Sequence, residues 1–80
     1  MNIEEKVISA AAEAYGVDQS TITVDTNVRE QLSSKSLKLL VFISNIEEEL
    51  DVRIEIREAA KLITIGDFVD KVRQSAKWHG

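Results

Sequence analysis

The chain has 80 residues and a formal net charge of −4; 44% of its residues are hydrophobic and 30% are charged. This size and composition are typical of one small globular domain and exclude a disordered chain. The sequence contains no cysteine, which excludes disulfides and thiolate metal sites. The negative charge argues against general nucleic-acid binding, which depends on lysine and arginine contacts to phosphates.

No apolar run approaches the roughly 20 residues that cross a bilayer. The first residues, MNIEEK, lack the basic and apolar parts of a signal peptide. We therefore expect a cytoplasmic protein without a membrane span.

The first predicted helix covers residues 2–15. Asn2 is the expected cap, with Glu5 three residues later as its partner in a capping box. The apolar residues Ile3, Val7, Ala11 and Ala14 then share one face of the helix. Gly16 follows and suits the left-handed position that ends helices.

Residues 17–35 show no sustained period. Ile22 and Val24 alternate with threonines and could form a strand, but no second alternating run exists to pair with it. We predict a long connection that apolar side chains pin to the core, at Val17, Ile22, Val24, Val28 and Leu32. Connections of this length in a small domain are often functional.

The second predicted helix covers residues 36–50. One apolar stripe recurs along it at Leu39, Phe42, Ile43, Ile46 and Leu50. Ser36 lies off this stripe, so we expect its hydroxyl to face solvent at the helix entrance. A polar turn, Ser33–Lys35, leads into it.

A short helix is predicted at residues 57–61 and a last long helix from a Thr64 cap, with Asp67 in the box position. The buried face of that last helix is expected at Ile65, Phe68, Val69 and Val72. Three main helices and one short one would thus form a single all-α domain over residues 1–77, followed by a disordered tail at 78–80.

Enzymatic activity is poorly supported. The only histidine, His79, is next to the last residue, and nothing pairs Ser36 with an evident base. The acidic run Glu47–Glu49 points in several directions around its helix, so at most two of its carboxylates could share a cation, and a solvated face is favoured. A helix-turn-helix reader of DNA is a weaker alternative, since it would need a basic recognition helix.

Residues 27–54 resemble the acyl carrier protein family, and the likeness extends from about Ile3 to about Val72. The shared frame, in step without a gap, consists of Leu32, Ser33–Ser34, Lys35-Ser36-Leu37, Glu47–Glu49, Leu50-Asp51 and Ile54. One residue departs from the family pattern, because Lys35 stands where the family has an acidic residue before the serine.

The resemblance implies an acyl-carrier-like helical bundle in which Ser36 receives 4'-phosphopantetheine from coenzyme A through a phosphopantetheinyl transferase. The arm would hold acyl groups as thioesters for enzymes of fatty acid, lipid or polyketide-type biosynthesis. The carrier would be a monomer without catalytic activity of its own. The residues leave open a protein-interaction module of the same fold that is not modified at Ser36.

The resemblance also implies a partner-binding surface at Lys35, Leu37, Lys38, Leu40 and Val41. In the family this face is usually acidic, whereas here it is apolar with two lysines at its start, which suggests dedicated partners. Two alternatives remain: that Leu40 and Val41 pack against the 17–35 connection, and that the lysines are merely solvated. Unpaired, the two lysines would oppose the helix dipole by about 0.3–1 kcal/mol, and a bound phosphate would offset this.

Overall fold

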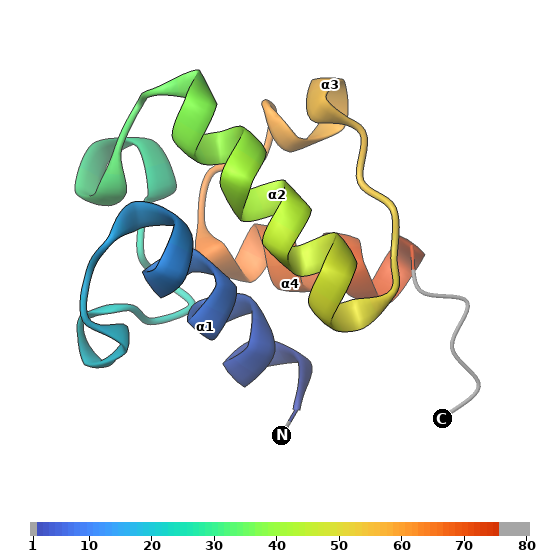
Figure 1. Ribbon diagram of the computed structural model, residues 1–80, viewed down its shortest axis with the longest axis horizontal. Helices are drawn as coiled ribbons and strands as arrows, with labels where there is room; N and C mark the ends of the chain where they lie inside the picture. The colour runs from blue at the N-terminus through green and yellow to red at the C-terminus, as the bar shows by residue number, and fades with distance from the viewer. Residues whose placement is uncertain (1, 76–80) are drawn as a thin grey trace.

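A computed structural model describes residues 2–75 and contains three long helices and a short one (Figure 1). They are α1 (Ile3–Tyr15), α2 (Ser36–Leu50), α3 (Ile56–Ala59) and α4 (Ile65–Ser75). The predicted all-α, carrier-like bundle is confirmed, and α3 begins one residue earlier and ends two residues earlier than predicted. The expected tail at 78–80 lies outside the described residues.

The helix ends follow the local signals in the sequence. The Asn2 side chain accepts a hydrogen bond from the Glu5 N–H at 2.8 Å and so caps α1. Gly16 ends that helix in the left-handed conformation, with φ of 68°. At α4 the Asp67 N–H donates to the Thr64 hydroxyl at 3.1 Å, and the Thr64 N–H donates to the Asp67 carboxylate at 3.1 Å. This reciprocal pair is the predicted capping box.

The connection between α1 and α2 is pinned to the core, as predicted. It contains a 3₁₀ turn, η1 (Gln19–Thr21), and a π-helical turn, η2 (Val28–Leu32), neither of which the sequence pattern indicated. Of the five predicted anchors, Ile22 and Val28 are buried, and Val17 and Leu32 are partly buried against the core. Val24 is only half-buried and does not belong to this core. Three backbone hydrogen bonds fasten it to the start of α4, joining Val28 N–H to Ile63, Ile65 N–H to Thr26 and Gly66 N–H to Val24.

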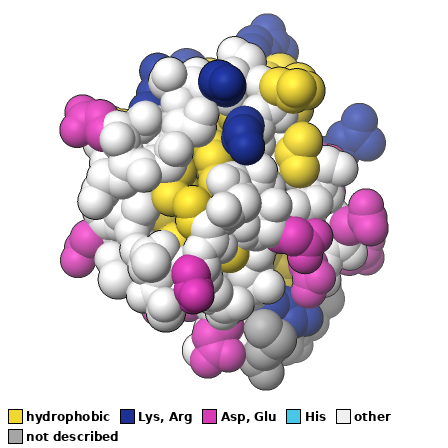
Figure 2. Space-filling view, turned by 60° about the vertical axis from the view of Figure 1, so that its left-hand side comes forward, with side chains coloured by type: hydrophobic (Ala, Val, Ile, Leu, Met, Phe, Trp, Pro, Cys, Tyr) yellow, Lys and Arg dark blue, Asp and Glu magenta, His cyan; other side chains and the backbone are white. Residues whose placement is uncertain are grey.

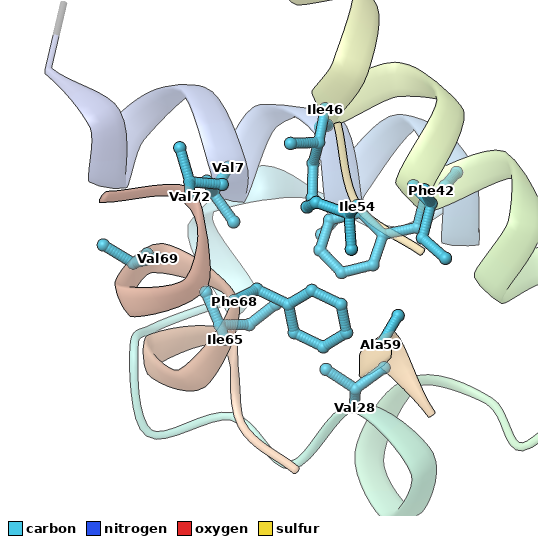
Figure 3. Close-up of a cluster of buried hydrophobic side chains, with 14 of the residues drawn as sticks. Val7, Val28, Phe42, Ile46, Ile54, Ala59, Ile65, Phe68, Val69 and Val72 are labelled. Atoms are coloured by element: carbon cyan, nitrogen blue, oxygen red, sulfur yellow. The ribbon is translucent and has the colours of Figure 1, made fainter. Parts of the chain in front are cut away.

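Aromatic rings fill the middle of the core (Figure 3). Phe42 of α2 and Phe68 of α4 are both fully buried, and their ring centroids lie 4.8 Å apart. Tyr15 of α1 meets Phe42 edge-on at a centroid distance of 5.7 Å. The Phe68 ring points toward Ala59 of α3 and Val28 of η2, so one side chain of α4 links the short helix and the connection to the core.

One carboxylate at the acidic end of α2 binds a backbone amide. The Glu47 carboxylate accepts a hydrogen bond from the Ile54 N–H at 2.9 Å, which fixes the chain where it leaves the helix.

Residues 2–75 contain no cluster of three or more His, Asp or Glu side chains placed to hold a metal ion. Across the same residues, no helix has both the length and the apolar character needed to cross a membrane.

Candidate functional site

Ser36 is the first residue of α2 and is exposed to solvent. The turn before it is held on both sides: the Ser33 N–H donates to the Val28 carbonyl at 2.9 Å, and the Ser33 hydroxyl accepts from the Lys35 N–H at 3.1 Å. Because Val28 of η2 is buried and its N–H bonds to the Ile63 carbonyl, this turn is tied to the core through η2. Ser36 is thereby presented in a fixed place at the helix entrance.

The Ser36 hydroxyl does not cap its own helix. The cap position belongs to Lys35, which has extended backbone angles and makes no side-chain capping bond. Within residues 2–75, the Ser36 hydroxyl has no protein hydrogen-bond partner. Ser36 is therefore the first helical residue and not the cap, and its side chain is exposed to solvent.

The start of α2 is suited to an anion. The Ser36 and Leu37 amides open the helix, where N–H groups lack intrahelical acceptors and the helix dipole favours negative charge. Lys35 is exposed and Lys38 is half-buried, and both belong to the same turn. The free amides and the two lysines make this end of α2 favourable for negative charge.

A cavity of about 170 Å³ opens beside Ser36 and reaches into the bundle. Residues of five elements, α1, η2, α2, α3 and α4, contribute to its wall. Figure 1 shows the start of α2 at the top of the view, between η2 and α3. It is lined by Tyr15, Val28, Arg29, Ser33, Ser34, Lys35, Ser36, Leu39, Leu40, Ile56, Ala59, Ala60, Leu62 and Phe68. Of these residues Ser34, Lys35 and Ser36 are exposed, whereas Tyr15, Val28, Ala59 and Phe68 are buried.

Two contacts tie the α3 wall of this cavity to the rest of the bundle. The Arg29 guanidinium donates to the Ala60 carbonyl at 2.6 Å, and the Lys71 ammonium pairs with the Glu58 carboxylate at 2.9 Å. The ion pair is partly exposed to solvent, where such pairs contribute at most about 1 kcal/mol. Ala59 is the only buried residue of α3, so little side-chain burial holds this part of the wall.

Tyr15 is one of the cavity residues that sequence reasoning missed. It is 6% exposed, and its hydroxyl has no partner among the described residues. Burial raises the pKa of this phenol, because removal from water disfavours the phenolate. The sequence shows only that a tyrosine occupies the last position of an alanine-rich helix. That position does not indicate whether the hydroxyl has a hydrogen-bond partner.

The outer face of α2 is exposed and apolar. Leu37 is 72% exposed, Leu40 is 49% exposed and Val41 is 42% exposed. Leu40 lines the cavity together with Val28 and Ser33 of the connection, so the alternative in which Leu40 and Val41 pack against the connection stays a prediction. Ile56 of α3, which the sequence reading did not single out, is 45% exposed. Figure 2 shows exposed apolar side chains beside basic ones in the upper half of one face, with acidic side chains mostly around its sides and lower half.

An exposed serine at the entrance of the second helix, above an apolar cavity, is the arrangement of a helical carrier domain. Comparison with known proteins agrees. The family described as "Phosphopantetheine attachment site" matches residues 5–72. Acyl carrier proteins of Shigella flexneri and Shigella dysenteriae are each 36% identical over 75 residues, covering 94% of this chain and 96% of theirs. That of an Exiguobacterium species is 36% identical over 63 residues, covering 79% and 80%.

The chain belongs to the acyl carrier protein family of phosphopantetheine-binding domains. Its prosthetic group is therefore phosphopantetheine, and the residues at the start of α2 fit that group. Carriers of this family are not enzymes; they are served by a phosphopantetheinyl transferase and by enzymes that act on acyl groups. The expectation that this chain has no catalytic activity of its own follows from that membership.

Proposed function

We propose that Ser36 is the attachment point of 4'-phosphopantetheine and that this monomeric, cytoplasmic carrier, formed by residues 1–77, serves fatty acid, lipid or polyketide-type biosynthesis. When bound, the group supplies a thiol that holds acyl chains as thioesters. The observation that carries the proposal is the exposed Ser36 hydroxyl at the first position of α2, with no hydrogen-bond partner in the described part of the chain.

Attachment requires one substitution at phosphorus. The Ser36 hydroxyl oxygen forms a bond to the phosphorus nearest the pantetheine part of coenzyme A, and the bond from that phosphorus to the adenosine bisphosphate breaks. The hydroxyl proton goes to a base of the transferase. Ser36 has no neighbouring base of its own, so its part is to be reachable, and its exposure meets that requirement.

The neighbouring residues would bind and orient the product of that step. The free amides of Ser36 and Leu37, with the ammonium groups of Lys35 and Lys38, favour the phosphodiester charge. The cavity beside Ser36, about 170 Å³ in volume, would shelter the carried chain from water. Its α3 wall, held by two surface contacts, is the part that would move to admit the chain.

Partner enzymes would dock on Lys35, Leu37, Lys38, Leu40 and Val41. These side chains combine exposed apolar area with positive charge around Ser36. A complementary partner presents an apolar surface with acidic residues at its rim. Such a partner differs from one with a basic patch, which would repel the lysines at the start of α2.

The test is incubation of the full chain with coenzyme A and a broad-specificity phosphopantetheinyl transferase, followed by intact-mass measurement. We expect one phosphopantetheine added per chain, none in Ser36→Ala, and normal addition in the matched control Ser34→Ala, which alters an exposed serine two residues earlier. Addition to the Ser36→Ala variant would place the attachment elsewhere. A wild-type chain that stays unmodified with competent transferases would favour an interaction module without the arm.

A further inference from the structure

The large apolar side chains that remain exposed come from one stretch of the chain. Between residues 2 and 75 they are Leu37, Leu40 and Val41 of α2, Ile56 of α3 and Ile63 just before α4. In this described part of the chain, none of them belongs to α1 or α4. Exposed apolar side chains that gather in one patch are a feature of interaction surfaces.

The apolar patch of α2 continues onto α3. Leu40 of α2 and Ile56 of α3 line the same cavity, the one that opens beside Ser36. Leu40 is 49% exposed and Ile56 is 45% exposed, so both side chains border the cavity and also face solvent. The two helices are in contact, and Figure 1 shows α3 close to the first turns of α2. Ile63, by contrast, does not line this cavity.

The charged side chains on the cavity wall have one sign. Among the residues that line the cavity, only Arg29 of η2 and Lys35 are charged, and both are exposed cations. The carboxylate of α3, Glu58, pairs with the Lys71 ammonium of α4 at 2.9 Å. Two other exposed carboxylates are near in the sequence but do not line the cavity either, namely Glu30 and Glu55.

The secondary structure limits the form that a bound partner segment can take. Strand addition needs an exposed sheet edge, and residues 2–75 contain no strand, only an isolated bridge between Asn27 and Thr64. A proline-rich segment needs a groove lined by aromatic rings, and the described rings are all buried, namely Tyr15, Phe42 and Phe68. An apolar surface formed by two helices suits the apolar face of a third helix.

We propose that partner enzymes bind across α2 and α3 with an acidic amphipathic helix. Its apolar side chains would pack on Leu37, Leu40 and Ile56, and its carboxylates would pair with Arg29 and Lys35. The inference rests on the proposed function and deepens it, because it adds η2 and α3 to a docking surface proposed on α2 and names the element that binds there. A basic helix with the same apolar face would be repelled by the two cations.

Arg29 can take part without leaving its contact in the fold. Its guanidinium donates to the Ala60 carbonyl from one terminal nitrogen, and the other nitrogens of the group also carry N–H donors. A carboxylate accepts such donors in charge-assisted hydrogen bonds, which are stronger than neutral ones. Pairing with Arg29 would therefore bring the partner helix to the α3 side of the cavity.

The test uses the full chain as Ser36→Ala, which lacks the proposed attachment hydroxyl, and two synthetic stapled helices. The helices share one leucine face and differ only in the flanking residues, which are glutamate in one and lysine in the other. Binding is measured by calorimetry and by NMR shifts of the ¹⁵N-labelled chain. We expect the glutamate helix to shift the signals of both Leu40 and Ile56 and to bind at least about tenfold more tightly than the lysine helix. Added salt should weaken its binding.

Two matched pairs of variants, made in the same chain, test the surface itself. Ile56→Glu should weaken binding of the glutamate helix by about tenfold or more, whereas Ile63→Glu should not, since Ile63 is 57% exposed but lies off the cavity. Lys35→Glu should also weaken binding, whereas Arg73→Glu, the same change in net charge at an exposed position of α4, should not. Circular dichroism checks that each variant is folded.

The inference is overturned if neither helix binds, if both bind equally, or if Ile56→Glu binds the glutamate helix as tightly as its parent chain does. Binding to phosphatidylglycerol vesicles without binding to the glutamate helix would assign the surface to an anionic lipid and would overturn it as well. These measurements do not depend on the arm. A wild-type chain that competent transferases leave unmodified would refute the proposed function, whatever the helices do.

Discussion

The Asp67 side chain binds two backbone amides at the start of α4. Its carboxylate accepts hydrogen bonds from the Ile63 N–H at 2.9 Å and from the Thr64 N–H at 3.1 Å. These two backbone donors lower the pKa of the carboxyl, because they bind its charged form. The same residue thus caps α4 and fixes the chain segment that pairs with the connection before α2.

The lowered pKa of Asp67 predicts an acid-sensitive contribution to stability. A carboxyl with a lowered folded pKa stabilises the fold above its unfolded pKa of about 3.9, and this is lost as the pH falls through the folded value. We therefore expect the free energy of unfolding, measured in urea, to fall less below about pH 4 in Asp67→Asn than in the wild type. Some acid dependence should remain, since hydrogen bonds from Ser20 also lower the pKa of Asp18.

The matched control is Asp70→Asn. Asp70 is an exposed carboxylate on the same helix, and its ion-pair contact in the described chain is with Arg73 at 3.9 Å. That variant should follow the wild-type acid profile. If the free energy of unfolding of Asp67→Asn falls with pH as steeply as that of the wild type, the hydrogen bonds at the start of α4 do not cause the acid sensitivity.

At the scale of the element, α2 divides its two faces between different tasks. Phe42, Ile43 and Ile46 are buried in the core, while Leu37, Leu40 and Val41 remain exposed. Exposed apolar side chains in one patch are a feature of interaction surfaces. The helix is therefore held by one face and free to recognise partners with the other.

This division predicts that Val41→Glu separates recognition from folding. Val41 is 42% exposed, so the change should alter the free energy of unfolding by no more than about 0.5 kcal/mol. The rate of phosphopantetheine transfer should fall, because the partner would have to desolvate a carboxylate. The measurements are urea unfolding and transfer rate as a function of carrier concentration.

Ser44→Glu is the matched control, since Ser44 is exposed on the same helix and lies almost one turn beyond Val41. It should retain both stability and transfer. Unchanged transfer in Val41→Glu, with lost stability, would instead mean that Val41 contributes to packing and not to docking.

At the scale of the whole molecule, Phe68 lies at the centre of the core. It is fully buried, packs against Phe42 with the two rings tilted by 44° and their centroids 4.8 Å apart, and lines the cavity with Ala59 and Val28. An 80-residue domain is expected to have a total stability of only about 4–12 kcal/mol. One central ring is therefore a large part of what keeps the bundle folded.

Phe68→Ala should lower the free energy of unfolding by about 3–5 kcal/mol, from lost apolar burial and the space left behind. Far-ultraviolet circular dichroism during thermal unfolding measures the change, and a chain unfolded at room temperature would agree with it. Phe68→Leu should cost clearly less, because it keeps most of the apolar volume. An alanine variant as stable as the leucine variant would mean that the ring has no central role.

Local signals along the chain determined the helices and the position of Ser36. The cap residues at Asn2 and Thr64, the left-handed Gly16 and the apolar period of α2 act within a few residues, so they can be read without knowing the fold. The family frame around Ser36 is equally local. Because Ser36 lies off the apolar stripe, its exposure could be predicted from helix geometry alone.

The tertiary structure alone decided the cavity, the unpaired Tyr15 hydroxyl and the exposure of Leu40 and Val41. Tyr15 and Ser36 are brought to one cavity by contacts among five separate elements. Whether a buried hydroxyl finds a partner depends on atoms far away in the sequence, and so does the side of α2 that the other helices leave uncovered. Periodicity identifies which residues share a face, but only packing settles what that face meets.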